Sequence, residues 1–214
     1  MAIVNLTRKI LPKICTDSAK NLAALNKMPE MRLQNAINAG DKSIVHVSMN
    51  ESAAVRILRG CINTVYTDAL ASCNAVGVIA KGKDGCPVAI LSHYTPLPLS
   101  VLNQIKALEK QLKTYDYWID KDVKPQVFFN IRGYQRPDNP QELITGSNPI
   151  LSGVRRMLSK FFPNGITETV VPYQNNKRPA YFSSANIYQF DPENLNKLKV
   201  TTVGEKEHFI DLQF

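Results

Sequence analysis

Membrane-spanning and metal-binding patterns are missing from this chain of 214 residues. No stretch approaches the roughly 18 consecutive apolar residues that a transmembrane helix needs. Met1–Asn21 has no uninterrupted apolar segment followed by a small-residue cleavage site, so we predict no secretory signal peptide. His46, His93 and His208 lack zinc-ligand spacing, and no Cys-x-x-Cys pair is present. We therefore expect no membrane segment, no metal and no other cofactor.

Cysteines are few, and glycine-rich nucleotide-binding motifs are absent. The four cysteines are Cys15, Cys61, Cys73 and Cys86. A chain of this size can bury enough apolar surface to fold without disulfides, and no export signal is predicted, so we expect all four thiols to be reduced. Because neither a Gly-x-Gly-x-x-Gly nor a Walker pattern occurs, nothing in the sequence indicates nucleotide chemistry.

Acidic residues are outnumbered by basic ones, 18 against 26, which leaves a net charge of +8. Such a charge favours association with an acidic partner. The densest basic groups, Arg8–Lys13 and Arg155–Lys160, are short, and no known DNA- or RNA-binding pattern accompanies them. We expect a monomer that binds neither nucleic acid nor membrane. The charge fits an acidic surface on a protein partner, and it also fits a basic soluble protein that has no acidic partner.

Hydrophobic periodicity predicts an α+β fold in which a mixed, largely antiparallel sheet packs with helices. Residues 1–40 are predicted to form a helical N-terminal extension, and residues 41–214 a single domain. Helices are predicted at Leu99–Tyr115 and Ile150–Phe162, and a turn-rich loop at Arg136–Asn148. The predicted strands are Ser43–Met49, Val55–Tyr66, Val76–Lys81, Val88–Tyr94, Gln126–Gly133, Thr167–Tyr173, Ala180–Phe190, Leu198–Val203 and His208–Phe214.

The most informative residues flank a predicted hairpin, whose turn is Gly82–Gly85. Cys73 stands at the start of its first strand and His93 at the end of its second. In a hairpin these two ends meet at the same edge of the sheet. A cysteine thiolate beside a histidine base can attack a carbonyl carbon. Thr67, just upstream, would supply the oxygen that orients the imidazole, and backbone N–H groups near Cys73 would form an oxyanion hole.

Structural interpretations compete with this catalytic one. Cys73 also fits a small buried core residue, and His93 a hydrogen-bonded histidine at a strand end. Cys61 is predicted to be a core residue. Cys86 lies seven residues from His93 along one strand, over about 20 Å, which is too far for a pair. His46 is predicted to be a strand residue without a role, and His208 a surface residue.

The same residues resemble a known enzyme family. Thr67, the segment Leu70-x-Ser72-Cys73 and the segment His93-Tyr94-x-x-Leu97-Pro98 are similar to motifs of the chemoreceptor glutamine deamidase CheD. Ala71 replaces a glycine of that pattern, Tyr94 replaces a phenylalanine, and the interval between Cys73 and His93 is longer. The Cys-His core also occurs in the catalytic domain of cytotoxic necrotizing factor and in the Burkholderia lethal factor, toxins that deamidate a glutamine on a host protein.

The resemblance implies a fold and a function. Residues 41–214 would form a layered α/β sandwich with mixed sheets and would be a deamidase-like catalytic domain. Cys73 would be the nucleophile, His93 its base and Thr67 the orienting residue of a protein glutamine deamidase of the toxin branch. Such a protein would be made in the bacterial cytoplasm without a classical signal peptide, secreted, and delivered to the host cytosol. We expect the loops Arg136–Asn148 and Tyr115–Asp122 to contact the protein substrate. The alternatives are a cysteine protease or transglutaminase of related chemistry, and a non-catalytic binding module of the same fold.

Overall fold

The structure, a computed structural model, describes residues 29–68, 70, 73–145, 148–173, 185–202 and 206–212. The chain divides into two compact units, Met1–Asp41 and Lys42–Phe214. The described part of the first unit is helix α2 (Pro29–Asn38), followed by Gly40 with a φ of 92°. A glycine in this conformation is a common helix terminator because it has no Cβ to clash. The rest of the predicted N-terminal helical segment lies outside the described residues.

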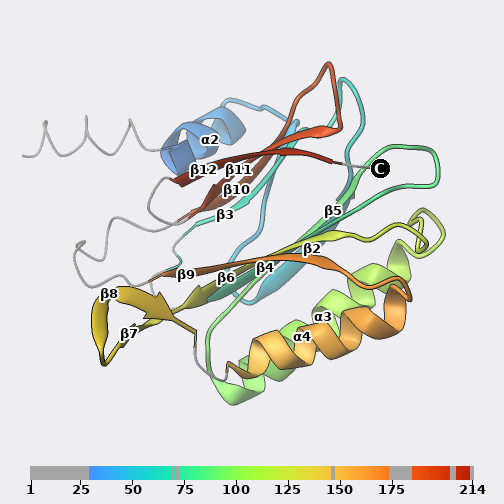
Figure 1. Cartoon of the computed structure of the whole chain (residues 1–214). Helices are drawn as coiled ribbons and strands as arrows, with labels where there is room; N and C mark the ends of the chain where they lie inside the picture. Colours follow the sequence, from blue (N-terminus) through green and yellow to red (C-terminus); the bar gives the residue numbers. More distant parts are fainter. Residues whose placement is uncertain are drawn as a thin grey trace, which may run out of the picture. The chain divides into compact units, whose positions relative to one another are not determined.

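The second unit contains two five-stranded sheets and a short hairpin (Figure 1). We call β1-β3-β10-β11-β12 sheet A and β2-β5-β4-β6-β9 sheet B, in spatial order. The strands of sheet A are β1 (Ile44–His46), β3 (Thr64–Thr67), β10 (Asn186–Phe190), β11 (Lys197–Thr202) and β12 (Lys206–Asp211). Those of sheet B are β2 (Glu51–Arg56), β4 (Asn74–Ala80), β5 (Val88–Tyr94), β6 (Gln126–Arg132) and β9 (Thr167–Tyr173).

Most neighbouring strands are antiparallel, and the pairs β1–β3 and β6–β9 are parallel. Helices α3 (Pro98–Thr114) and α4 (Pro149–Phe161) cover one face of sheet B, and sheet A packs on its other face (Figure 1). The predicted α+β class with mixed, largely antiparallel sheets is therefore confirmed. Both helices begin and end within one residue of their predicted bounds.

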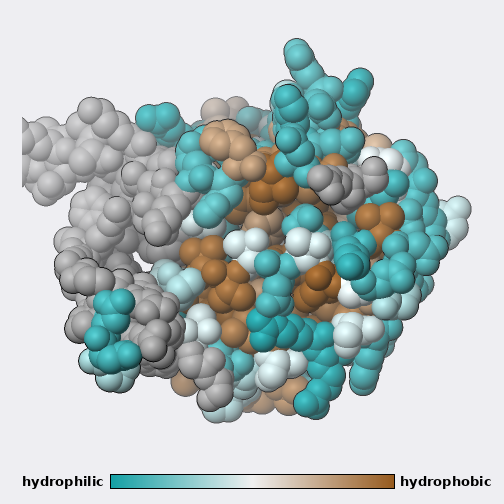
Figure 2. All heavy atoms as spheres, viewed as in Figure 1, coloured by the Kyte–Doolittle hydropathy of each residue, from teal (hydrophilic) through white to brown (hydrophobic). Residues whose placement is uncertain are grey.

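Strand β4 lies at the centre of this arrangement and is buried on both faces. Val76 and Val78 pack in the cluster that α3 and α4 cover, whereas Ile79 packs in the cluster between the sheets. Because side chains alternate along a strand, Ala75 and Gly77 face sheet A together with Ile79. Figure 2 shows hydrophobic residues gathered in the middle of this side of the molecule, with hydrophilic residues around them.

Two predictions about secondary structure are wrong. The run Val55–Tyr66 is not one strand, because a turn at Gly60, with a φ of 72°, separates β2 from β3. Cys61 is therefore exposed and not a core residue. The segment Arg136–Asn148 is not simply a loop, since β7 (Tyr134–Arg136) and β8 (Asn139–Ile144) form a hairpin there. Of the strand predicted at Ala180–Phe190, residues 180–184 lie outside the described residues.

The two sheets are in tight contact where Gly77 of β4 faces Tyr188 of β10. A Cβ added to Gly77 would overlap the Tyr188 hydroxyl. Tyr188 is fully buried and packs against Phe128, with their ring centroids 5.4 Å apart. The absence of a side chain at position 77 therefore sets the spacing between the sheets at this point.

We expect Gly77→Ala to lower the free energy of unfolding by about 1–3 kcal/mol, because the added methyl group overpacks the contact with Tyr188. Denaturant unfolding measures this change. The double variant Gly77→Ala/Tyr188→Leu should lose less free energy of unfolding than the two single variants lose in total, since shortening residue 188 makes room for the methyl group. Strict additivity in this cycle would contradict the proposed contact.

Candidate functional site

Cys73 and His93 lie at the same edge of sheet B. Strands β4 and β5 form the predicted hairpin, with Ala75 directly opposite His93. Cys73 is two residues before Ala75 and belongs with it to a small buried cluster that also contains Tyr173. It is therefore a diagonal neighbour of His93, a relation in which Cα atoms lie about 7–8 Å apart. Direct contact between the thiol and the imidazole remains a prediction.

His93 is held by a residue of the opposite sheet. Its Nδ1 lies 2.7 Å from Oγ1 of Thr67, the last residue of β3. The predicted contact between Thr67 and His93 is thus present, although their roles in catalysis remain predictions. In the tautomer that leaves Nε2 unprotonated, the Nδ1–H group donates to the threonine oxygen. Among the described residues the buried Nε2 has no hydrogen-bond partner.

Burial lowers the pKa of His93 from 6.5 to about 4, against the opposing effect of the nearby Asp68 carboxylate. A buried imidazole loses the hydration that stabilises its charged form. His93 is therefore neutral at pH 7, and its free Nε2 can accept a proton. This is the state that a general base needs before it deprotonates a thiol.

Hydrogen bonds from distant parts of the sequence fix the backbone at Cys73. The Tyr173 hydroxyl, at the end of β9, donates to the carbonyl oxygen of Cys73. The next carbonyl, that of Asn74, accepts a bond of 3.4 Å from Gln104 Nε2 of α3, which also lies 2.8 Å from Ser92 Oγ. Sequence analysis missed both donors. The available signal was Gln104, a polar residue on the otherwise apolar stripe of α3.

Met49 indicates where Cys73 approaches the protein surface. The Cys73 side chain is only 5% exposed, but its Sγ lies 3.8 Å from Met49 Sδ, and Met49 is 54% exposed. A flexible, polarisable methionine adapts its shape readily to a neighbouring group. The thiol is therefore separated from the surface by one movable side chain on this side.

A second histidine, His46, lies near the site and was predicted to have no role. Its Nε2 is 3.1 Å from the carboxylate of Asp68, the residue that follows Thr67. The hydrogen bond to His46 is the largest contribution to the lowered pKa of Asp68. A carboxylate at this position keeps a negative charge near His93.

The other cysteines do not share this setting. Cys61 and Cys86 are free thiols, and Cys15 lies outside the described residues. Burial and the Asp84 carboxylate raise the pKa of Cys86, which disfavours its thiolate. Cys86 lies at the turn between β4 and β5, at the opposite end of β5 from His93.

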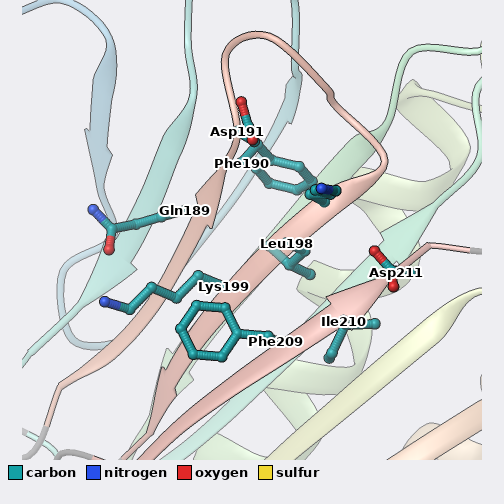
Figure 3. A pocket seen from close by; sticks show the side chains of 9 residues that line it. Gln189, Phe190, Asp191, Leu198, Lys199, Phe209, Ile210 and Asp211 are labelled. Carbon is teal, nitrogen blue, oxygen red and sulfur yellow. The ribbon is translucent and has the colours of Figure 1, made fainter.

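A surface hollow of about 500 Å³ lies elsewhere. It is formed by the ends of β10, β11 and β12 that are remote from Asn186, with the exposed Phe209 and the half-buried Lys199 among its side chains (Figure 3). The described residues that line it are Gln189, Phe190, Asp191, Lys197, Leu198, Lys199, Phe209, Ile210 and Asp211. These residues offer neither a thiol nor an imidazole.

The segment Tyr115–Asp122 is also remote from Cys73, contrary to prediction. Lys81 and Gly82, which follow the far end of β4, pair with Asp120 and Ile119. Because β4 spans seven residues, that end lies about 20 Å from Cys73. Substrate contacts by this segment are thus not supported. The β7–β8 hairpin, by contrast, follows the site end of β6 directly.

Within the described ranges, no helix is long and apolar enough to cross a membrane. The same residues contain no cluster of three or more His, Cys, Asp or Glu side chains that could hold a metal ion.

The lowered pKa of His93 predicts a pH-dependent stability. Between pH 6.5 and 4 the unfolded chain binds a proton at residue 93 that the folded chain does not. The free energy of unfolding should therefore fall as the pH is lowered through this window, by up to about 3 kcal/mol. Denaturant unfolding at a series of pH values measures the slope. His93→Gln should flatten it, and an unchanged slope in this variant would assign the effect to other groups.

Comparisons with known proteins include a weak similarity to a solved structure. No protein-family model matches the sequence, and no curated protein matches it. Among solved structures, the C-terminal domain of CNFy from Yersinia pseudotuberculosis is 11% identical, with a TM-score of 0.34. The match covers 78% of this chain but 62% of that one, less than two thirds of its length. Similarity at this level assigns neither a family nor a role to any residue.

Proposed function

We propose that this protein hydrolyses the side-chain carboxamide of a glutamine on another protein, giving glutamate and ammonia. The observation that carries the proposal is the 2.7 Å contact between Thr67 Oγ1 and His93 Nδ1, which leaves Nε2 of a neutral imidazole free beside β4, the strand that Cys73 directly precedes. The motif resemblance of Thr67, Cys73 and His93 to glutamine deamidases supports the same assignment.

The chemistry requires two half-reactions. The Cys73 thiol transfers its proton to His93 Nε2, and the thiolate attacks the amide carbon to form a C–S bond and an oxyanion. When this intermediate collapses, the C–N bond breaks and the imidazolium gives its proton to the departing ammonia. Water, deprotonated by His93, then attacks the thioester, and the C–S bond breaks to release the carboxylate and the thiol. Thr67 holds the imidazole in the tautomer that both steps need.

Exposed apolar residues near Cys73 support a macromolecular substrate. Met49 contacts the nucleophile, and Leu97 and Leu99 follow shortly after His93 on the chain; all three are largely exposed. Exposed apolar side chains that lie close together commonly mark protein-binding surfaces. The net charge of +8 favours a target with an acidic surface. The motif resemblance supports a bacterial effector that acts in the host cytosol.

Deamidation adds one dalton to the target, which distinguishes it from the alternatives. We expect Cys73→Ala to abolish the one-dalton gain on lysate proteins, and Thr67→Val to lower kcat about 10–100-fold, because the imidazole loses its orienting contact. Mass spectrometry of lysate proteins, combined with ammonia release, measures both effects. Acidic isoelectric points among the modified proteins would fit the proposed partner.

Thr64→Val is the matched control, since Thr64 is also buried on β3 but bonds to Asn63. It should leave kcat unchanged. Peptide cleavage or cross-linked products in place of the mass gain would favour a protease or a transglutaminase. Retention of the biological effect by Cys73→Ala would favour the non-catalytic binding module.

The apolar surface near the nucleophile predicts a separate effect on substrate binding. Met49→Ser and Leu99→Ser should each raise KM for the protein substrate several-fold, because they remove contacts around the reacting side chain. Phe209→Ser is the control, since Phe209 is 77% exposed but borders the hollow at the far end of sheet A. Steady-state kinetics with the identified target measures KM. Equal effects of all three substitutions would contradict docking near Met49.

A further inference from the structure

Two buried asparagines face the space between the sheets at the site and have unused hydrogen-bonding atoms. Asn130 of β6 and Asn186 of β10 are fully buried. Both Nδ2 and Oδ1 of Asn130 lack a partner among the described residues, as does Oδ1 of Asn186. Leaving a buried amide unpaired costs about 1–3 kcal/mol, and native proteins contain few such groups. Two of them near one nucleophile require an explanation.

The strand register places Asn130 beside the nucleophile. Ala75 of β4 is directly opposite both His93 of β5 and Asn130 of β6, so these three residues form a row across sheet B. Asn130 faces sheet A, as does Phe128 two residues earlier, which contacts Tyr188. Cys73, two residues before Ala75, is therefore a diagonal neighbour of Asn130 on one side and of His93 on the other. The residue between them, Ala75, has a small side chain.

Asn186 approaches the same space from sheet A. It is paired with Thr67, which contacts His93. It also lies two residues from Tyr188, whose hydroxyl meets Gly77 of β4. These two contacts align Asn186 with the Ala75 end of β4. Its Nδ2 donates to the Tyr188 hydroxyl over 2.7 Å, which holds the side chain in place and leaves Oδ1 available.

The free atoms are complementary to a carboxamide. A carboxamide presents one carbonyl acceptor and two N–H donors, whereas a carboxylate presents acceptors only. Asn130 Nδ2 offers a donor, and Asn186 Oδ1 offers an acceptor that is fixed by the Tyr188 hydrogen bond. The product of hydrolysis is a carboxylate, which has no hydrogen to donate to Asn186 Oδ1. The two oxygens would repel each other, so the same arrangement favours release of the product.

We propose that Asn130 and Asn186 are the carboxamide-recognition pair of this site. Asn130 Nδ2 donates to the substrate carbonyl oxygen and remains bound as that oxygen becomes an oxyanion, and Asn186 Oδ1 accepts a hydrogen bond from the substrate NH₂ group. This inference rests on the proposed function, because it assigns the groups that distinguish glutamine from glutamate at the same nucleophile.

The test uses two alkylating reagents of similar size, iodoacetamide and iodoacetate, and needs no knowledge of the protein target. Alkylation of Cys73 brings a carboxamide or a carboxylate into the space beside Ala75. The measured quantity is the ratio of the two alkylation rates at Cys73, divided by the same ratio at the exposed Cys61 of the same chain. Peptide mass spectrometry after chymotryptic cleavage at Tyr66 separates the two cysteines.

The ratio is the rate with iodoacetamide divided by the rate with iodoacetate. In the wild type we expect its normalised value to be about ten, which corresponds to the free energy of a single hydrogen bond. Asn130→Asp, Asn130→Leu and Asn186→Leu should each bring it close to one. Asn74→Leu is the matched control, since Asn74 is equally buried but faces the helices on the other side of β4. It should keep the wild-type ratio.

Thermal unfolding separates recognition from a structural role. Asn130→Leu should leave Tm unchanged or raise it, because it removes an unpaired buried amide and keeps a similar volume. A large loss of Tm, a wild-type ratio in the Asn130 variants, or a Cys73 that neither reagent alkylates while Cys61 reacts would overturn the inference.

The two proposals fail separately. A selective Cys73 alkylation that depends on Asn130 and Asn186, without a one-dalton gain on any protein, would refute the deamidase and retain the recognition pair. If Cys73→Ala abolishes deamidation but alkylation of the wild type is unselective, the deamidase is retained and the recognition pair is refuted.

Discussion

The contact between Thr67 and His93 is the interaction on which the site depends, because it joins the two sheets of the sandwich. Thr67 ends a strand of sheet A and His93 lies near the end of a strand of sheet B. A buried polar contact between sheets restricts their relative position more than apolar packing does, since hydrogen bonds are directional. The imidazole is therefore oriented by the tertiary structure and not by its own strand.

Several of the buried polar atoms that lack a partner among the described residues lie at the site, and others lie elsewhere in the interior. His93 Nε2, the amide of Asn130 and Oδ1 of Asn186 are the ones that face the space between the sheets at the site. Each lowers stability, and sequences selected for stability alone would replace them with apolar residues. Gln104 Nε2 and the Tyr173 hydroxyl, by contrast, donate to backbone carbonyls at Asn74 and Cys73. The structure thus separates groups that hold the site from groups that remain available to a ligand.

Local patterns were enough to predict the hairpin, because Cys73 and His93 flank two apolar strands joined by a short turn. They were also enough for α3 and α4, whose apolar residues follow helical spacing. Cys61 was misplaced because its β-branched neighbours outweighed Gly60, whose positive φ makes the turn. Tyr173, Asn130 and Asn186 could not be found in this way. They reach the site through strand pairings of high sequence separation, which composition and periodicity do not specify.

Strand order explains why Cys73, the proposed nucleophile, precedes β4. The chain leaves sheet A at Thr67 and enters sheet B at Asn74, so Cys73 ends the connection between Thr67, which contacts His93, and the strand that pairs with β5. Gly77 and Tyr188 prevent the sheets from moving closer, and the Thr67–His93 contact opposes their separation. With its carbonyl bound by Tyr173, Cys73 has little freedom to move away from β5. A nucleophile held in this way has lost much of its conformational entropy before a substrate arrives, which is the condition under which proximity accelerates attack.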